Sequence, residues 1–357
     1  MRTALIGLGG VADRIHLPAI RAVPAIELVG ACEPDAARRD AIGRKFGIRA
    51  LYPDAARLLD AERPDVVIIG SPPDSHRDLC LLALTHGAHV FCEKPFVASV
   101  GQGEDVVEAA ARANRLVAIN NQYRYMPIYR RTRERLANGE FGDLFLVQCW
   151  QQMFHPPSKE TNWRAGLVRS TFFEFGTHAL DLLCYFFDAM PSSVMAHMPH
   201  PRADIAADVV VAATLTFPGE RVASMVFNRI SHAPTRYLEM RLDCRDASVR
   251  ISLGGVARAA LDWSSERHRP LLRASFVRGG EARVEKAGRS TTIVRETQPA
   301  FASATASNLR RFIDAIERGD RSTTEVRYAA NLIRVVFAAY DSAERGATVS
   351  LHELARV

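Results

Sequence analysis

The feature that constrains the fold most is the alternation of two patterns through residues 1–120. One pattern is a short, continuous apolar run, found at 3–7, 26–32, 65–70, 88–92 and 116–120. Continuous runs are typical of strands that are buried on both faces. The other is a helical segment that several times begins at Asp or Ser and ends at Gly or Asn. This alternation predicts an α/β fold with a doubly wound parallel sheet.

The pattern changes after residue 140. Period-two alternation over 144–152 is followed by strand-like runs with short turns between them, at 207–217, 221–230, 236–244 and 247–253. Such a series predicts an antiparallel sheet. Two amphipathic helices, at about 301–318 and 325–344, close the chain. We therefore predict a dinucleotide-binding Rossmann domain over 1–122 and an α+β domain over 123–357 with a large, mostly antiparallel open sheet.

A glycine-rich turn, GLGGVA at 7–12, joins the first predicted strand to a helical segment. It fits the pattern G-x-G-x-x-A, in which Gly7 makes the tight turn, Gly9 lets a pyrophosphate approach the backbone, and Ala12 allows close helix packing. The helix start then offers N–H groups to the phosphates. We predict that the turn, including Gly10 and Val11, binds a dinucleotide; a purely structural turn is the alternative. Pro18 should break or kink this helix near residues 16–17.

Glu33 ends the second predicted strand, where an acidic side chain can accept the ribose hydroxyls of the adenosine. A carboxylate there would repel a 2′-phosphate, so NAD is favoured as cofactor. Arg38 and Arg39 follow within about one helical turn and keep NADP possible.

Lys94 follows the apolar run 88–92, and Ser71, Pro72 and His76 follow the run 65–70. Ligands of parallel sheets bind at the carboxyl ends of the strands, so these residues should face the nicotinamide end of the cofactor. A lysine in that place could exchange a proton with a substrate hydroxyl. Position alone leaves an equal alternative, in which Lys94 merely pairs with Glu93.

Several motifs occur in a characteristic order: GLGGVADRIHLPAI, SPPDSH, GAHVFCEKPF, NNQYRYMP, NWR and EFGTHALDLL. Together they resemble the glucose–fructose oxidoreductase/inositol dehydrogenase (Gfo/Idh/MocA) family. The resemblance implies a Rossmann domain joined to an open antiparallel sheet, and oxidation or reduction of a hydroxyl on a sugar, inositol or similar polyol. It also implies that Lys94 contacts the substrate beside the nicotinamide, with Glu93 at the cofactor.

The segment 170–183 places Glu174, His178 and Asp181 at i, i+4 and i+7, on one helical face. The residues alone favour a structural histidine, whereas the resemblance implies a catalytic one. An imidazole can relay a proton near neutral pH. The family usually has aspartate where this chain has Glu174, and small glycines where it has Ser170 and Thr171. The longer carboxylate would lie over an ångström away, which indicates a reshaped pocket.

Further substrate-binding candidates lie after the last parallel strand and in a loop of the second domain: Tyr123, Arg124, Asn162, Trp163 and Arg164. Trp163 could stack on a sugar face, and Arg164 could bind a carboxylate or phosphate. The two histidine-containing segments at 197–200 and 352–356 lack ligands at metal spacing, so no metal site is predicted.

Composition limits the partners. The net charge is +6, but the charges are dispersed, and even the basic run 129–135 is best explained as a solvated helix face. We expect no nucleic-acid partner, no membrane span and no signal peptide. Six cysteines without a C-x-x-C pair indicate a reducing cytoplasm. An exposed apolar sheet face would need covering, so we expect a homodimer or homotetramer through the C-terminal sheet.

These observations predict an NAD(P)-dependent oxidoreductase that transfers hydride between nicotinamide and a hydroxyl or keto carbon of a polyol-like substrate. Lys94, His178 and Glu174 would form its catalytic group. Two alternatives stay open. One is an NAD-dependent glycoside hydrolase of the same fold, and the other is a catalytically silent dinucleotide-binding regulator.

Overall fold

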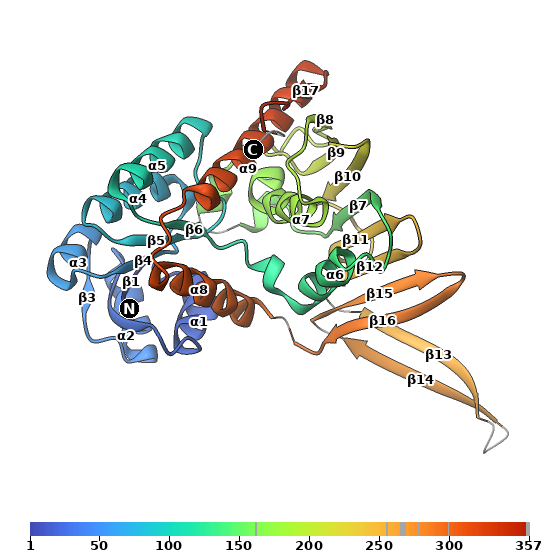
Figure 1. Ribbon diagram of the computed structural model, residues 1–357, viewed down its shortest axis with the longest axis horizontal. Helices are drawn as coiled ribbons and strands as arrows, with labels where there is room; N and C mark the ends of the chain where they lie inside the picture. The colour runs from blue at the N-terminus through green and yellow to red at the C-terminus, as the bar shows by residue number, and fades with distance from the viewer. Residues whose placement is uncertain (161–162, 255, 265–268, 278, 299, 355–357) are drawn as a thin grey trace. The chain divides into compact units, whose positions relative to one another are not determined.

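The computed structural model describes residues 1–357 apart from 161–162, 255, 265–268, 278, 299 and 355–357 (Figure 1). The chain divides into two compact units. The first unit comprises Met1–Tyr125, Phe172–Asp181 and Phe301–Asp341; the second comprises Met126–Thr171, Leu182–Ala300 and Ser342–Val357. Each unit therefore combines segments that are far apart in the sequence, which differs from the single boundary expected after residue 122.

The first unit is built on a six-stranded parallel sheet in the order β3-β2-β1-β4-β5-β6. Its strands are β1 Arg2–Ile6, β2 Glu27–Cys32, β3 Leu51–Tyr52, β4 Val66–Ile69, β5 His89–Cys92 and β6 Val117–Ile119. Every residue of β4 and β5 is buried, because helices cover both faces of the sheet (Figure 1). The predicted doubly wound sheet is confirmed, and only the two-residue β3 was not foreseen.

Short polar caps define the helices that connect these strands. The helices are α1 Leu17–Arg21, α2 Ala36–Phe46, α3 Ala55–Glu62, α4 His76–Thr85 and α5 Val100–Ala113. Asp35, Asp54 and Ser99 each accept a backbone N–H of the first turn of their helix. Gly47 caps the end of α2 and Asn114 the end of α5, both with a left-handed backbone. The predicted starts at Asp or Ser and ends at Gly or Asn are confirmed for these two helices.

Two C-terminal helices belong to the first unit: α8 Phe301–Glu317, and α9 Thr324–Arg345 as far as Asp341. The apolar face of α8 enters the core beside α1 and the sheet, and the rings of Phe312 and Phe91 lie 5.8 Å apart. Helix α9 passes α5 at Gly103, where an added Cβ would lie 3.2 Å from that of Ala330. We had placed both helices in the second domain, because an amphipathic pattern does not reveal which sheet receives its apolar face.

The second unit contains a nine-stranded sheet in the order β16-β15-β12-β11-β7-β10-β9-β8-β17. All neighbours pair antiparallel except β7 with β10. The strands are β7 Leu144–Gln152, β8 Ser193–His197, β9 Val210–Phe217, β10 Arg221–Asn228, β11 Arg236–Cys244, β12 Ser248–Leu253, β15 Gly280–Lys286, β16 Arg289–Glu296 and β17 Val349–Ser350. The predicted open, mostly antiparallel sheet is confirmed.

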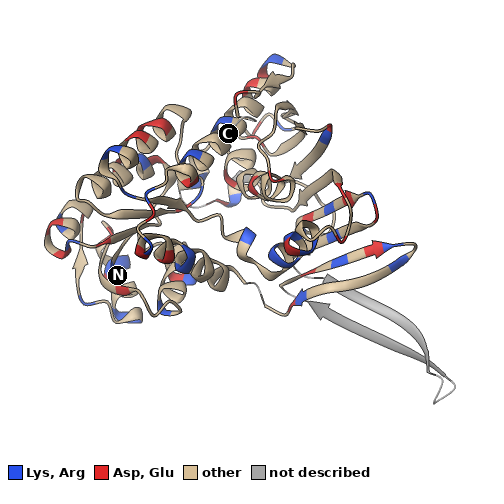
Figure 2. Ribbon diagram, viewed as in Figure 1, with Lys and Arg blue, Asp and Glu red and all other residues tan. Residues whose placement is uncertain are grey.

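The rest of the second unit includes β13 Val256–Ser264 and β14 Arg269–Val277, an antiparallel pair outside the main sheet that the sequence did not reveal. Helix α6 Pro127–Ala137 contacts β15 and β16, and α7 Thr177–Phe187 begins in the first unit and ends in the second. Lys and Arg are interspersed with Asp and Glu along the helices of the first unit (Figure 2). In the part of the chain that the structure describes, no helix combines the length and apolar content needed to cross a membrane.

Candidate active site

The glycine turn follows β1 and is the tightest part of the site. Gly7 has φ +90°, and a Cβ there would lie 2.8 Å from the backbone N of Ser71 and 2.9 Å from the carbonyl carbon of Gly70. No other residue fits this contact between two backbones. A Cβ on Gly9, in contrast, would meet nothing within 4 Å. The open space over Gly9 fits the close approach of a pyrophosphate.

The segment after the turn is a π-helix, Ala12–His16, which passes directly into α1. Pro18 is the second residue of α1, so the change in helix type falls at the predicted place. A proline lacks the N–H that would continue the first helix, and the wider π turn accommodates it. Gly10 is exposed and Val11 half-buried at the start of this segment.

The carboxylate of Glu33 is buried and already oriented by the turn. Its Oε2 accepts the N–H of Leu8 at 3.0 Å, and its Oε1 accepts the N–H of Asp35 at 3.1 Å and an Arg38 N–H at 3.4 Å. Arg39 donates to the Glu33 carbonyl. A carboxylate oxygen can accept more than one hydrogen bond, so Glu33 can still take a ribose hydroxyl. Arg38 and Arg39, the two arginines for which NADP stays possible as cofactor, therefore both contact Glu33.

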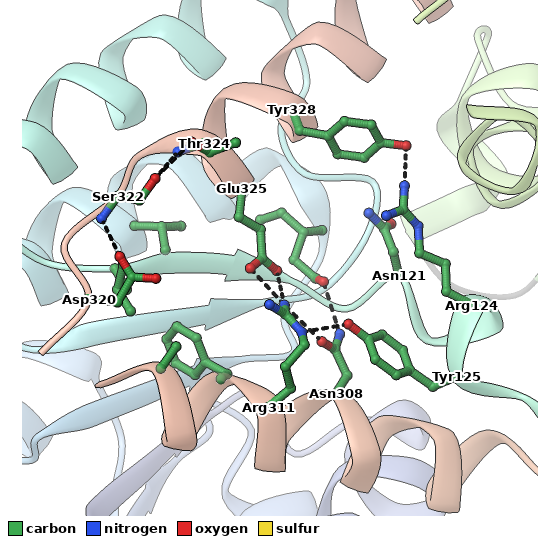
Figure 3. A pocket seen from close by; sticks show the side chains of 15 residues that line it. Asn121, Arg124, Tyr125, Asn308, Arg311, Asp320, Ser322, Thr324, Glu325 and Tyr328 are labelled. Carbon is green, nitrogen blue, oxygen red and sulfur yellow. Dashed lines mark hydrogen bonds and ion pairs between the residues drawn. The ribbon is translucent and has the colours of Figure 1, made fainter. Parts of the chain in front are cut away.

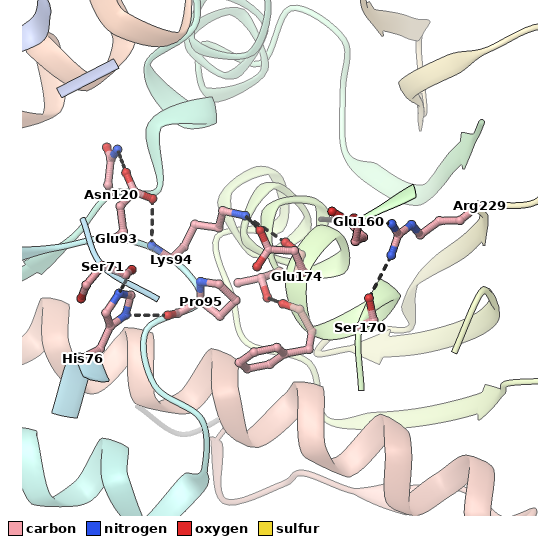
Figure 4. Close-up of polar contacts among 12 residues, drawn as sticks. Ser71, His76, Glu93, Lys94, Pro95, Asn120, Glu160, Ser170, Glu174 and Arg229 are labelled. Atoms are coloured by element: carbon pink, nitrogen blue, oxygen red, sulfur yellow. Dashed lines mark hydrogen bonds and ion pairs between the residues drawn. The ribbon is translucent and has the colours of Figure 1, made fainter. Parts of the chain in front are cut away.

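His76 is placed differently from the expectation that it contacts the cofactor. Its ring is fully buried, with Nδ1 3.0 Å from the carbonyl oxygens of Pro95 and Phe96 and Nε2 2.8 Å from that of Ser71 (Figure 4). Burial lowers the pKa of His76, against the opposing effect of these carbonyls. The side chain therefore joins the 71–76 turn to the lysine segment, while Ser71 is half-buried and Pro72 exposed.

Lys94 reaches into the first unit and does not point to solvent. Its side chain is 13% exposed, and Nζ donates to the carbonyl oxygen of Glu174 at 3.0 Å and to Oε1 of Glu174 at 3.1 Å (Figure 4). The carboxylate of Glu93 instead accepts the backbone N–H of Lys94 at 3.1 Å. The ammonium partner is thus Glu174, 80 residues along the chain, and not the adjacent Glu93.

His178 lies on the first turn of α7, directly after the π-helix Thr171–Gly176 that carries Glu174. Its imidazole stacks on Tyr123 with the ring centroids 3.9 Å apart and the planes 4° from parallel. Burial lowers the pKa of His178 well below its usual value, and the positive charge of Lys94 lowers it further. The imidazole is therefore neutral at neutral pH.

Arg124 holds the helix that bears His178. Its Nε and a terminal nitrogen contact the two carboxylate oxygens of Asp181 at 2.8 and 2.7 Å, and Tyr328 donates to the same carboxylate at 3.0 Å. Burial raises the pKa of Asp181, although Arg124 opposes the shift. Arg124, a candidate for binding the substrate, contacts Asp181 through its guanidinium in the structure. Asp181, seven residues after Glu174, thus anchors α7 to Arg124 and Tyr328.

The remaining substrate candidates belong to the second unit. Trp163 and Arg164 lie in the 3₁₀ helix Trp163–Gly166, with the Arg164 guanidinium 4.4 Å from the centre of the Trp163 ring. Asn162 lies outside the described residues. In the same unit the fully buried Arg229 donates to Glu160 at 2.8 Å and to Ser170 at 2.9 Å, which fixes both sides of this segment.

A cavity of about 460 Å³ in the first unit was not foreseen (Figure 3). It lies beside β6 between α8 and the start of α9. Arg311 fills much of its polar wall, donating to both oxygens of Glu325 at 2.7 Å and to the hydroxyl of Tyr125 at 2.6 Å. The principal charged groups of the cavity are therefore bound to one another, and we assign them no ligand.

Comparison with known proteins shows the family of the chain. Residues 1–121 match the oxidoreductase family with the NAD-binding Rossmann fold, and residues 129–250 match the Gfo/Idh/MocA C-terminal domain. The chain is 27% identical to the D-apiose dehydrogenase of Paraburkholderia graminis, across 98% of this chain and 90% of that protein. A match of 31% identity to the D-glucoside 3-dehydrogenase of Escherichia coli spans 41% of this chain and 42% of that protein.

Solved structures share the fold. An oxidoreductase from Agrobacterium radiobacter, solved in complex with NAD⁺, L-tartaric acid and magnesium, superposes with a TM-score of 0.82 over 98% of each chain. At 20% sequence identity this likeness supports the architecture alone.

Proposed function

Because the chain belongs to the Gfo/Idh/MocA oxidoreductase family, we propose that it transfers hydride between NAD and a hydroxyl or keto carbon of a sugar, inositol or related polyol. The observation that carries this proposal is the group formed by Lys94, Glu174 and His178. The ammonium of Lys94, which follows β5, binds Glu174, and its charge acts on the imidazole of His178. All three residues belong to the unit that contains the glycine turn. Relatives with sugar and inositol dehydrogenase activity support the substrate class.

The proposed roles follow from the contacts. Bound NAD would supply the hydride acceptor. The ammonium of Lys94 donates to the reacting oxygen of the substrate, and Glu174 keeps that ammonium in place. The neutral imidazole of His178 accepts the hydroxyl proton during oxidation and returns it during reduction. The backbone at Gly9 would hold the pyrophosphate, and Glu33 would bind the ribose and disfavour a 2′-phosphate.

The same proposal covers substrate contacts and assembly. Tyr123, Arg124, Asn162, Trp163 and Arg164 stay the further candidates for contact with the substrate. A homodimer or homotetramer would cover the open sheet, since Val226 is 49% exposed and pairs with the half-buried Trp150 on the neighbouring strand. All six cysteines are buried and free, which supports a reducing cytoplasm as the proposed location.

The test is a substitution of Lys94. NADH and NADPH absorbance is followed across a panel of sugars, inositols and sugar derivatives, and Lys94→Ala is compared with Lys286→Ala, which removes an exposed lysine from the end of β15. We expect Lys94→Ala to lower kcat about 10²- to 10⁴-fold, because a positioned proton-transfer group contributes on that order. The affinity for NAD⁺ should stay within about threefold of the wild type, and Lys286→Ala should change neither quantity.

Two results would contradict the proposal. Unchanged turnover in Lys94→Ala would remove the lysine from the chemistry. Release of a sugar without net formation of NADH would favour the glycoside hydrolase alternative.

A further inference from the structure

His16 is a buried residue for which the proposed chemistry has no use. It ends the π-helix behind the glycine turn, and its side chain is fully inaccessible. Its Nε2 lies 2.9 Å from Oε1 of Glu93. The approach is close but not linear, and among the described residues neither ring nitrogen has another hydrogen-bond partner. A buried polar side chain normally has a polar partner. The proximity of Glu93 therefore explains why this buried position has a histidine and not an apolar residue.

The carboxylate of Glu93 contacts both His16 and the backbone of Lys94. Its Oε1 also accepts the side-chain N–H of Asn120 at 2.6 Å, and its Oε2 accepts the backbone N–H of Lys94 at 3.1 Å. Burial would raise the pKa of Glu93, but His16, Asn120 and the charge of Lys94 together hold it below its usual value. Glu93 is thus a charged, buried group that needs all its partners and directly fixes the backbone at Lys94.

The surroundings are shaped for an imidazole at position 16. Gly70 directly follows β4, and a Cβ on Gly70 would lie 3.3 Å from Cδ2 of His16. On the other side of the lysine segment, His76 contacts the carbonyl oxygens of Pro95 and Phe96. The segment 93–96 is therefore contacted by two buried histidines, His16 at the end of the π-helix and His76 at the start of α4.

We infer that His16 is a positioning residue for Lys94, acting through the carboxylate of Glu93. The inference rests on the proposed function, because it assigns to His16 the orientation of the lysine that meets the substrate. Loss of the imidazole leaves Glu93 buried with one partner fewer, so the carboxylate shifts and releases the backbone N–H of Lys94. The ammonium then spends less time at Glu174, and catalysis loses its oriented donor.

The experiment compares His16→Leu, which cannot donate to Glu93, with His16→Gln, which can. His86→Leu is the matched control, because His86 is an exposed residue that directly follows α4 and contacts Asp60. Amide hydrogen exchange is measured over residues 92–97 and over β4 in all three full-length variants. We expect exchange over 92–97 to be about tenfold faster in His16→Leu, with β4 unchanged and His16→Gln close to the wild type.

Kinetics give the second readout. With NAD⁺ and the substrate of highest turnover in the panel, kcat of His16→Leu should fall about 10- to 100-fold, and His16→Gln should recover most of it. The Kd for NAD⁺ should stay within about threefold. Exchange over 92–97 that is the same in His16→Leu and wild type would overturn the inference, as would an equal rise over β4, which indicates general destabilisation.

Failure of the inference is distinguishable from failure of the proposed function. If Lys94→Ala is inactive while His16→Leu keeps its kcat, only the role of His16 is wrong. If Lys94→Ala keeps full turnover, the proposed chemistry is wrong, and the exchange measurement still decides whether His16 holds the segment.

Discussion

At the scale of a residue, Glu174 has one methylene more than aspartate, and this determines how far its carboxylate reaches. Its side chain is long enough for Oε1 to reach the ammonium of Lys94 at 3.1 Å, and its own carbonyl oxygen accepts the same ammonium at 3.0 Å. The family usually has aspartate here, as noted from the sequence. We expect the side-chain contact to depend on the longer side chain, because a buried ion pair tolerates little change in geometry.

Shortening this side chain tests the dependence. In Glu174→Asp the carboxylate retreats by more than about one ångström, so we expect kcat to fall about 10- to 100-fold. Glu174→Gln keeps the length without the charge and should weaken the hold on Lys94 while leaving the affinity for NAD⁺ within about threefold. Steady-state kinetics with the substrate of highest turnover provide the measurement. A faster Glu174→Asp enzyme would mean that the pocket does not require this reach.

At the scale of an element, the glycine turn separates folding from binding. Gly7 is required by its positive φ and by the backbone of Gly70 and Ser71, whereas Gly9 faces open space. Folding therefore requires glycine at position 7, whereas binding of the proposed ligand requires glycine at position 9. The spacing of the motif predicts that both glycines are needed. It does not show how strictly, because spacing contains no information about the atoms that surround them.

Two alanine substitutions should therefore have different effects. Gly7→Ala should lower the free energy of unfolding by at least about 1 kcal/mol, since it combines a left-handed backbone with a contact of 2.8 Å. Gly9→Ala should leave thermal stability almost unchanged and weaken NAD⁺ binding about tenfold or more, because its methyl group occupies the phosphate position. Thermal denaturation and calorimetric titration distinguish the two. Equal loss of stability in both variants would contradict this division.

At the scale of the whole molecule, stability depends on pH through buried histidines. His89 opens β5, is 6% exposed, and its Nδ1 accepts the N–H of Leu116 at 2.9 Å. Burial, helped by the charge of Arg115, lowers the pKa of His89 to about 4. Between this value and the ordinary value near 6.5, the unfolded chain binds a proton that the folded chain does not. Stability from His89 is therefore complete above about pH 6.5 and is lost as the pH falls toward 4.

This dependence is measurable against His89→Asn, whose side-chain oxygen can still accept from Leu116. We expect the wild type to lose about 1 kcal/mol more than the variant between pH 7 and pH 5, after allowance for solvent screening. The apparent melting temperatures at the two pH values give the comparison. Parallel pH curves for the two proteins would show that His89 does not titrate in this range.

The sequence predicted what depends on local patterns. Strands β4 and β5 were found because every residue in them is buried, and the glycine turn because its spacing is distinctive. Contacts between distant segments were out of reach. Nothing near Arg124 indicates Asp181 as its partner, and nothing near His16 indicates Glu93. Residues in polar contact across a fold leave no period in the chain, so neither contact could be predicted from the sequence.

The composition of the first unit has a consequence for the synthesis of this protein. Its core is complete only when α8 and α9 join a sheet whose last strand ends at Ile119. At ~5–20 residues per second, about 10 to 40 s pass between the appearance of residue 125 and that of residue 341. During that interval the nascent sheet lacks the cover that Leu309, Phe312 and Ile313 provide. Transiently exposed apolar surface of this kind favours aggregation, so we expect the nascent chain to need protection until α8 has been made.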